Sequence, residues 1–455
     1  MTIPETRQIH HGALAIWRSG TNDHLLATVF LLALVVRLIN LALLTHRDDF
    51  FAEQDAFAYW AFADGLSKPD TFWLTFLSMT DRMPLYPLLL AGIRHTIGDV
   101  PRSVALIQAV IDAGSCALIA ALGALVSPRT GLIAGLLAAL SVTLIVFSTQ
   151  ILTESLFLFF FTLVLLTGAH FLRGPTMGLA LLAGMAGGLA LATRPVVAML
   201  LAAAVPLIFV VTLVRRRSVA LTLATATLFA VTAAAPTIPV LLRNAVYYDS
   251  YSVTSQTGDH LALWVVPLVS ERANGTPYQT TFDRMEVLYR QEASGEANPF
   301  RRSAIASRLA WQELARLPLG AYAKAWLEGI VVDLAAPALL ADPRVRALPK
   351  PSFYNTPGAS LWQKAWAYTF DDPGRYQFLL VVGLIATLPF LALEGVGYVM
   401  LAREMPWAAI LAGGVLAYFL LLSGPVATPK YRLPMEPVLI VLAAIPLAWV
   451  AERRR

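Results

Sequence analysis

The chain has 455 residues, of which 57% are hydrophobic and 14% are charged, and its mean hydropathy is +0.65. These values lie outside the range of soluble domains and predict a polytopic membrane protein. The net charge of +5 does not indicate nucleic-acid binding, because Lys and Arg are scattered at the ends of apolar segments rather than gathered in a patch. Cys116 is the only cysteine in the sequence, so an intrachain disulfide and a C-x-x-C motif are excluded. It lies in an apolar run.

Ten apolar stretches are candidates for membrane-spanning helices, which need about 20 residues each. In chain order they are 24–45, 103–126, 131–147, 152–171, 177–193, 195–213, 219–242, 377–400, 406–423 and 434–450. No A-x-A cleavage site follows the first stretch, so we expect a retained span rather than a cleaved signal peptide. The predicted fold is therefore an all-α polytopic bundle of about ten transmembrane helices.

Basic residues at the connections between these stretches predict the orientation in the membrane. If the spans alternate, one side collects Arg7, Arg18, Arg129, His170, Arg173, residues 215–217, Arg403 and residues 453–455. The positive-inside rule makes this side cytoplasmic. The loop 46–102 and the long segment 243–376 then both lie on the outer face.

We expect three parts in the chain. Residues 1–242 form an N-terminal transmembrane module that contains the outer loop 46–102, residues 243–376 form an outer-face cap, and residues 377–455 form the C-terminal transmembrane helices. The aromatic content of the cap segment is typical of a folded unit with interfacial helices. We interpret the apolar stretch 319–341 as a juxtamembrane or re-entrant helix, because one more span would break the alternation.

The loop 46–102 carries the first candidates for chemistry, because acidic residues crowd there at a membrane exit. These are Asp48, Asp49, Glu53, Asp55 and Asp64. An ionisable group at a membrane edge is costly unless it faces water, a partner or a substrate. Helical spacing predicts an interfacial helix over 55–66, with Asp55 near its start, where the helix dipole favours a carboxylate. Pro84 and Pro87 predict the start of a second interfacial helix over 84–97.

Six short motifs occur in an order that resembles a known family. They are Asp55-Ala-Phe-Ala-Tyr59, Asp81-Arg82-Met-Pro-Leu-Tyr86-Pro87, Leu152-Thr153-Glu154-Ser155-Leu156, Thr193-Arg194-Pro195, Leu242-Arg243-Asn244 and Lys430-Tyr431-Arg432-Leu433-Pro434. Together they resemble the GT-C class of membrane glycosyltransferases that use polyprenyl-phosphate sugars, especially its protein-mannosyltransferase-like and lipopolysaccharide-modifying, aminoarabinose-transferase-like branches. The resemblance covers about the first 245 residues and the last span. One departure is Met83-Pro84, where the family carries a Pro-Pro pair.

The resemblance implies that an Asp in the first outer loop is the catalytic base, and the matching residue is Asp55. A hydroxyl that attacks the anomeric carbon must lose its proton, and a carboxylate within hydrogen-bond reach can accept it. Direct displacement would invert the sugar. Two alternatives stay open: Asp55 is only a helix-start carboxylate, or Glu53, Asp48 or Asp49 is the base. A divalent metal ion held by Asp48, Asp49, Glu53 and Asp55 is also considered, although this spacing matches no dedicated metal motif.

The departing lipid phosphate needs fixed cations, and Arg82 is the first candidate. Four further basic residues at predicted outer helix ends would complete a phosphate clamp: Arg194, Arg243, Lys430 and Arg432. The alternative is that each of them reaches lipid headgroups. Tyr59 and Tyr86 are candidates for stacking on the sugar or for anchoring at the interface. Glu154 either begins a helix or lies near the sugar.

The sequence thus predicts a bacterial inner-membrane glycosyltransferase with its site on the periplasmic face. It would transfer a hexosyl or pentosyl group from a polyprenyl-phosphate donor to a lipid, glycan or protein of the cell envelope. No G-x-x-x-x-G-K loop is present, which disfavours a nucleotide sugar as the direct donor. The alternative from another class is a flippase for lipid-linked saccharides, which would place ionisable residues near the middle of the membrane.

Overall fold

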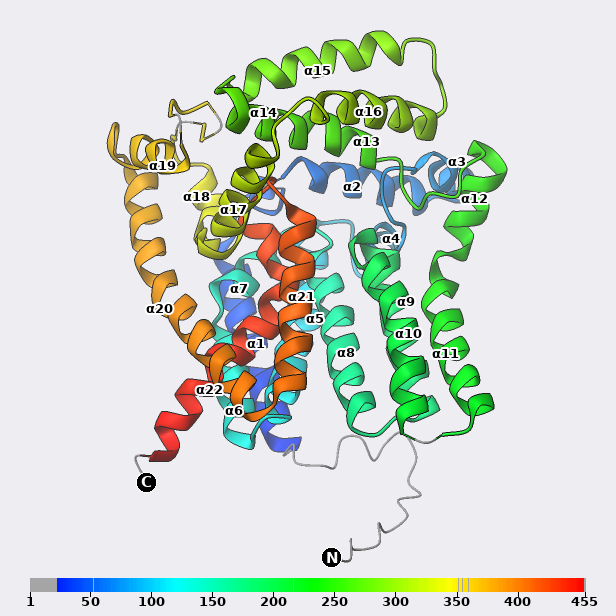
Figure 1. The fold of residues 1–455 in the computed structure, drawn as a ribbon, viewed down its shortest axis with the longest axis vertical. Coiled ribbons are helices and arrows are strands. Elements are labelled where there is room, and N and C mark those ends of the chain that lie inside the picture. Colours follow the sequence, from blue (N-terminus) through cyan, green and yellow to red (C-terminus); the bar gives the residue numbers. More distant parts are fainter. Residues whose placement is uncertain are drawn as a thin grey trace, which may run out of the picture.

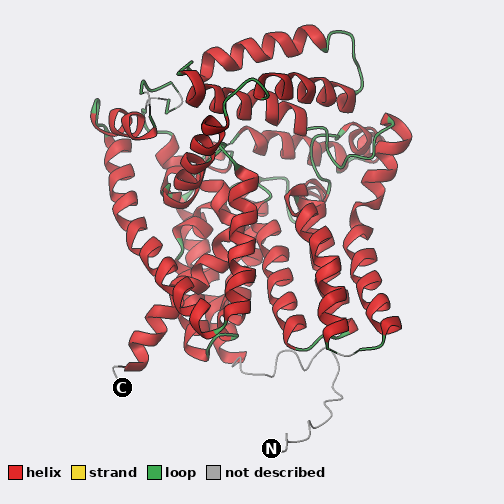
Figure 2. Cartoon of the chain, viewed as in Figure 1, coloured by secondary structure: helices red, strands yellow, loops and turns green. Residues whose placement is uncertain are grey.

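The computed structural model describes residues 23–453 except residues 52, 216, 351, 354 and 359. Helices and the turns between them make up this described part, and no strand occurs in it (Figure 2). Long helices stand side by side as a bundle, and shorter helices lie across one end of it as a cap (Figure 1). The all-α prediction is confirmed.

Within the described residues, eight helices are long and apolar enough to cross a membrane. They are α1 (Asp23–Leu43), α5 (Pro101–Ala124), α8 (Glu154–Arg173), η3 with α10 (Pro195–Val214), α11 to α12 (Val219–Tyr248), α20 (Arg375–Glu404), α21 (Pro406–Ser423) and η7 with α22 (Pro429–Arg453). The bent pair α6 (Pro128–Leu140) and α7 (Val142–Ser148) adds up to one more span, and α9 (Met177–Thr193) is a shorter apolar helix. Each of the ten predicted stretches corresponds to one of these elements.

The bend of 49° between α6 and α7 has a specific cause. Arg37 of α1 is fully buried and donates hydrogen bonds to the carbonyls of Ala138 at 3.1 Å and Ala139 at 2.5 Å. These carbonyls are at the C-terminus of α6, where they have no partner within the helix. Asp112 of α5 balances the guanidinium charge, with its Oδ2 2.7 Å from Arg37 Nε. A charge pair inside the bundle therefore stabilises a break in a helix.

Small residues let the helices of the bundle approach closely, as is typical of membrane helices. A Cβ added to Gly131 of α6 would lie 2.8 Å from the carbonyl oxygen of Ala120 in α5. A Cβ on Gly135, one turn later, would lie 2.6 Å from a methyl group of Val29 in α1. Any side chain at these two glycines would push the N-terminal helices apart.

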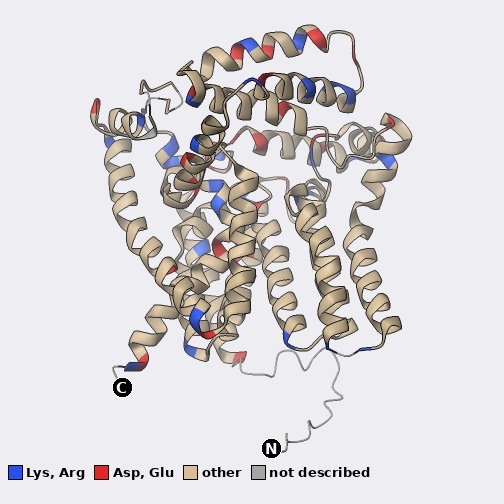
Figure 3. Ribbon diagram, viewed as in Figure 1, with Lys and Arg blue, Asp and Glu red and all other residues tan. Residues whose placement is uncertain are grey.

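The basic connections of the bundle gather at one end. Arg129 at the start of α6 pairs with Glu452 at the end of α22 at 2.9 Å. Arg173 donates to the carbonyl of Leu125, and Arg215 donates to the carbonyl of Leu172 at 3.1 Å. Figure 3 shows that charged residues lie mainly in the cap and at the ends of the bundle, whereas the long outer helices are mostly uncharged between their ends. Arg7, Arg18, Arg216, Arg454 and Arg455 lie outside the described residues.

The opposite end carries the helices of the two long connections. The first contributes η2 (Arg47–Phe50), α2 (Gln54–Leu66), α3 (Pro69–Ser78) and α4 (Leu85–Thr96). The second contributes α13 (Thr257–His260), η5 (Leu261–Val265), α14 (Val266–Asn274), α15 (Tyr278–Glu292), α16 (Pro299–Leu314), α17 (Leu319–Ala335), η6 (Ala338–Ala341), α18 (Pro343–Arg346) and α19 (Leu361–Phe370). The predicted interfacial helices 55–66 and 84–97 are thus found as α2 and α4. The 17-residue helix α17 accounts for most of the stretch 319–341 and is not among the candidate spans.

Candidate active site

Asp55 is the second residue of α2, in the first turn of that helix. Glu53 precedes the helix with extended backbone angles, and unpaired amide groups at this end favour negative charge. Ala56, Tyr59 and Ala63 form the buried face of α2. This packing fixes the helix against the bundle while the Asp55 side chain keeps 38% of its surface exposed. The carboxylate is therefore held in a rigid place but remains accessible.

Two cations flank the Asp55 carboxylate. Arg82, from the turn before α4, places Nη2 2.7 Å from Oδ1. Lys430, from the 3₁₀ turn before α22, places Nζ 3.4 Å from Oδ2. Both cations are largely buried, with 15% and 13% of their side-chain surfaces exposed. The first loop and the last span therefore meet at one carboxylate.

Glu53 extends this cluster. Its Oε2 lies 2.6 Å from Lys430 Nζ, which is closer than Asp55 comes to the same ammonium. Its Oε1 lies 3.1 Å from Nη1 of Arg346, at the end of α18. Lys430 is thus shared between two carboxylates, and a cation from the cap also reaches the site. Arg346 was missing from the sequence-based prediction, because nothing in its local pattern marks it.

The charges around Asp55 decide its protonation. Burial alone would raise the pKa of this carboxyl, but the positive charges of Lys430 and Arg82 outweigh burial and lower the pKa below its usual value. Asp55 is therefore ionised at neutral pH. Tyr59, one turn further along α2, is buried, and burial raises its pKa to about 12, so its hydroxyl stays neutral.

A second ion pair lies beside the first. Arg194, between α9 and η3, places Nη1 2.8 Å from Oε1 of Glu154, the first residue of α8. Only 3% of the Glu154 side chain is exposed, whereas 18% of the Arg194 side chain is. The Arg194 charge also acts on Tyr59 and Asp55, and the Lys430 charge acts on Glu154. The two ion pairs therefore form one electrostatic cluster.

Tyr59 and Tyr86 pack edge to face, with ring centroids 5.2 Å apart. The guanidinium carbon of Arg82 lies 5.8 Å from the centre of the Tyr59 ring, a favourable position for a cation over an aromatic face. Tyr86 is fully buried, and its hydroxyl donates to Oε1 of Gln108 at 2.6 Å. Tyr86 therefore packs against Tyr59 and helps to position its ring. A contact between Tyr86 and the substrate stays a prediction.

Two predicted phosphate ligands lie in other contacts. Arg243 donates to the carbonyls of Phe76 at 2.8 Å and Met79 at 2.7 Å and so holds the end of α3. Arg432 is paired with Glu436 at 2.9 Å and with Glu394 at 2.5 Å. The structure therefore brings together Arg82, Arg194 and Lys430 but not Arg243 or Arg432. Their phosphate-binding role stays a prediction that the geometry does not favour.

The four predicted metal candidates do not gather around one point. Asp49 accepts backbone hydrogen bonds from Thr45 at 3.0 Å and His46 at 2.9 Å and thereby orders the turn before α2. Glu53 and Asp55 both face cations. Among the described residues, no group of three His, Cys, Asp or Glu side chains is placed to share an ion. Carboxylates already neutralised by Arg and Lys do not fit a divalent cation, so we derive no step through a metal.

Comparison with known proteins gives one sequence-family match. The family model for dolichyl-phosphate-mannose-protein mannosyltransferases matches residues 81–242. Over these residues the chain is similar to this mannosyltransferase family. The matched segment contains Arg82, Tyr86, Glu154 and Arg194, and it confirms the resemblance inferred from the motifs. The description of that family names a lipid-linked sugar, dolichyl-phosphate mannose.

A similar solved structure is that of ArnT from Cupriavidus metallidurans in the apo state. It is 16% identical in sequence, with a TM-score of 0.36, and the alignment covers 93% of this chain and 78% of that one. No curated protein matches the chain. Asp55 and Lys430 lie outside the segment that the mannosyltransferase family model matches, so their roles depend on the geometry.

Proposed function

We propose that this protein is a glycosyltransferase that moves one sugar from a polyprenyl-phosphate donor to an acceptor by direct displacement, with Asp55 as the base. The observation that carries the proposal is the half-exposed Asp55 carboxylate held between Arg82 and Lys430. A base beside two cations is what the reaction needs, because a proton is removed at the acceptor while negative charge develops on the leaving phosphate.

The cluster offers several cations to an anionic ligand. Its ion pairs comprise four cations and four carboxylates: Arg82, Arg194, Arg346 and Lys430, with Glu53, Asp55, Asp81 and Glu154. The cluster is therefore formally neutral, and a phosphate would bind by competing with the carboxylates for their cations. Arg82 and Arg194 present planar donors that suit phosphate oxygens, and Lys430 acts as a point charge.

Donor binding would also activate the base. While Arg82 and Lys430 are paired with Asp55, they lower its pKa and make it a weak proton acceptor. A lipid phosphate that attracts both cations would weaken these pairs, and the pKa of Asp55 would rise towards the working pH. The base is then available only when the donor is in place, which protects the donor from premature attack.

The chemical step is balanced without any further reactant. The acceptor hydroxyl transfers its proton to Asp55, and its oxygen forms a bond to the anomeric carbon. The bond between that carbon and the phosphate oxygen breaks, and its electron pair remains on the phosphate, next to Arg82, Lys430 and Arg194. A single displacement inverts the configuration of the sugar.

We place this site on the periplasmic face of a bacterial inner membrane. The basic connections at Arg129, Arg173 and Arg215 share one end of the bundle, whereas α2 and the cap lie at the other end. The positive-inside rule supports a cytoplasmic location for the basic end. A lipid-linked donor could then enter sideways from the outer leaflet.

A flippase remains the alternative, and it has less support. Arg37 and Asp112 are ionisable residues inside the bundle, as a transport path would require, but they pair with each other and stabilise the break after α6. The accessible charges of the cluster lie beside the interfacial helix α2 instead. This arrangement suits chemistry at one face rather than passage through the membrane.

The test is transfer from a labelled polyprenyl-phosphate sugar in proteoliposomes that contain acceptor-bearing envelope extract. Asp55→Asn should abolish transfer, while Asp64→Asn is the matched control on the same helix. Asp64 pairs with Lys68 and Arg94, away from the cluster. Full transfer by Asp55→Asn in correctly inserted protein would overturn the proposal. Lipid profiling of a deletion strain should show the accumulated donor and so identify the sugar.

A further inference from the structure

Residues 421–432 comprise the end of α21, the turn that follows it and the first part of η7, and they carry Lys430 to the candidate site. We call this segment the strap. The helix α17 contacts the strap at four points along one face, and they involve Trp326, Gly329, Asp333 and Leu334. Trp326, Gly329 and Asp333 are spaced by three and four residues, which places them on one stripe of a helix. Leu334 makes its contact through its backbone carbonyl. The strap is thus bound along α17 rather than to a single residue.

The first contact is a hydrogen bond from a side chain, and the second is a close approach of two backbones. Trp326 Nε1 donates to the carbonyl of Leu421 at 3.0 Å. A Cβ added to Gly329 would lie 2.0 Å from the carbonyl oxygen of Gly424, so only glycine fits there. Gly424 itself has a φ of 59°, a left-handed conformation that favours glycine. The strap therefore begins at a position with little freedom to shift.

Asp333 makes the contact nearest to Lys430. Its side chain is completely buried, and Oδ1 accepts a hydrogen bond from the Thr428 amide at 3.1 Å. The other oxygen, Oδ2, has no hydrogen-bond partner among the described residues. A buried carboxyl group with an unpartnered oxygen costs stability. Packing alone does not explain this residue, because an apolar side chain would fill the same space at lower cost.

The Thr428 turn determines the position of Lys430. Thr428 Oγ1 accepts a hydrogen bond from the Lys430 amide at 3.1 Å and so caps the 3₁₀ turn η7. Two residues beyond the Asp333 contact, the Lys430 ammonium reaches Glu53 and Asp55. The contacts thus run in sequence from Asp333 to Thr428, and from Thr428 to Lys430.

We propose that Asp333 is a positioning residue that holds the Thr428 turn so that Lys430 faces Asp55 and the donor phosphate. This inference depends on the proposed transfer reaction and adds to it a residue that does not touch the reacting atoms. Leu334 supports the same turn, because its carbonyl accepts a hydrogen bond from Arg432. Arg432 thus fixes the end of the strap to α17, two residues after Lys430.

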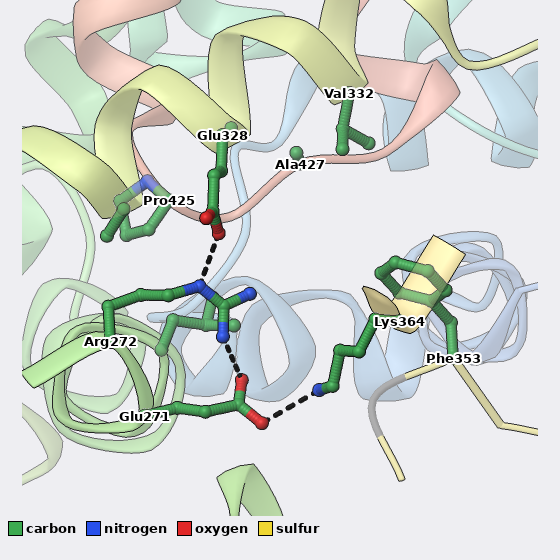
Figure 4. Close-up of a pocket in the computed structure, with 11 residues that line it drawn as sticks. Glu271, Arg272, Glu328, Val332, Phe353, Lys364, Pro425 and Ala427 are labelled. Atoms are coloured by element: carbon green, nitrogen blue, oxygen red, sulfur yellow. Dashed lines mark hydrogen bonds and ion pairs between the residues drawn. The ribbon is translucent and has the colours of Figure 1, made fainter. Parts of the chain in front are cut away.

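The cap is linked to the strap, and so indirectly to Lys430, through α17. A pocket beside the strap is lined by Glu328 of α17 and by Pro425 and Ala427 of the strap (Figure 4). Glu328 pairs with Arg272 of α14, which in turn contacts Glu271 at 2.7 Å. Glu271 also lies 2.7 Å from Lys364 of α19 (Figure 4). This chain of ion pairs connects α17 to α14 and α19. The cap therefore helps to hold α17, the helix that the strap contacts.

The test combines donor binding with transfer. Asp333→Ala should weaken binding of undecaprenyl phosphate about tenfold, the size expected for loss of one buried hydrogen bond that orders a charged ligand. Asp333→Asn keeps an acceptor oxygen for the Thr428 amide and should restore binding. Asp333→Leu fills the space without an acceptor and should behave like Asp333→Ala, which provides a second variant if alanine destabilises the fold. Leu327→Ala, at an exposed position of the same helix, is the matched control, and its donor binding should stay normal.

A double-mutant cycle separates positioning from a general structural role. In a Lys430→Ala background, Asp333→Ala should cause no further loss of donor binding, because its effect passes through Lys430. An equal loss in both backgrounds, or unchanged binding by Asp333→Ala and Asp333→Leu in wild-type background, would overturn the inference. The proposed function fails separately, if wild-type protein binds undecaprenyl phosphate but transfers no sugar.

Discussion

The Lys430 ammonium lies 2.6 Å from a Glu53 carboxylate oxygen, although the two residues are 377 positions apart in the chain. The same ammonium also faces Asp55. The first outer loop and the turn before the last span thus share a single charge. Removal of any one of these three charges therefore changes the electrostatic surroundings of the other two.

Lys430→Met should reduce transfer by about 100-fold, because a fixed cation at a developing phosphate charge contributes roughly this much. The donor KM should rise as well, since Lys430 would contact the phosphate before and during the reaction. Lys68→Met is the control, because Lys68 is exposed and, among the described residues, its ion-pair partner is Asp64 near the end of α2. Steady-state transfer with varied donor measures both parameters. Normal donor KM in Lys430→Met would contradict the phosphate role.

Arg82→Gln should shift the acidic limb of the pH profile to higher pH. Lys430 and Arg82 lower the pKa of Asp55 against the effect of burial, so loss of Arg82 lets burial raise it again. In the wild type, the depressed pKa keeps Asp55 ionised, and kcat/KM for the donor should stay flat down to about pH 5. The profile of kcat/KM against pH, which reports groups of the free enzyme, checks both statements. An unshifted limb in Arg82→Gln would assign the limb to another group.

Asp333 should make the folded protein less stable as pH rises. Burial raises the pKa of Asp333 to about 7, while the hydrogen bond from the Thr428 amide lowers it only in part. The folded state then binds a proton that the unfolded chain releases near pH 4, so stability falls between about pH 4 and pH 7 and is constant above. Asp333→Asn has no such proton, and its thermal stability should depend less on pH. Thermal unfolding in detergent at pH 5 and pH 8 measures the difference, and equal pH dependence of both proteins would refute it.

Asp112→Ala should destabilise the bundle by about 3–5 kcal/mol, because it leaves the Arg37 charge buried without its counter-ion. The double variant Arg37→Met with Asp112→Leu should recover part of this loss, since it removes both charges. The recovery should remain incomplete, because Arg37 also satisfies the carbonyls at the end of α6. Reversible unfolding in detergent compares the three proteins. A double variant less stable than Asp112→Ala would show that the pair itself is not the cause.

The sequence predicted the elements that depend on local pattern. The length of each apolar stretch located the spans, and Pro84 and Pro87 located the start of α4. Both kinds of signal are local, because each lies in or next to the helix that it predicts. The break between α6 and α7 could not be predicted, since its cause, Arg37, lies about 100 residues earlier. Only a three-dimensional arrangement places that guanidinium at the open carbonyls.

The candidate site was predicted in the same partial way. Position at a helix end made Arg194 and Arg243 equivalent candidates, and only their contacts separate them: Arg194 faces the cluster through Glu154, whereas Arg243 holds the end of α3. Arg346 and Asp333 gave no signal at all. They lie in the segment 245–376, where no motif is recognisable, and their importance comes from partners distant in sequence.

The position of Lys430 in the last connection also bears on biosynthesis. A ribosome inserts Asp55 early and Lys430 only when nearly the whole chain has been made. Until the final helix enters the membrane, the first loop has its carboxylates but lacks the ammonium that joins them. An incomplete chain in the membrane would therefore carry the Arg82–Asp55 pair without the Lys430 contacts. If the proposed reaction needs Lys430, a truncated product would not carry it out.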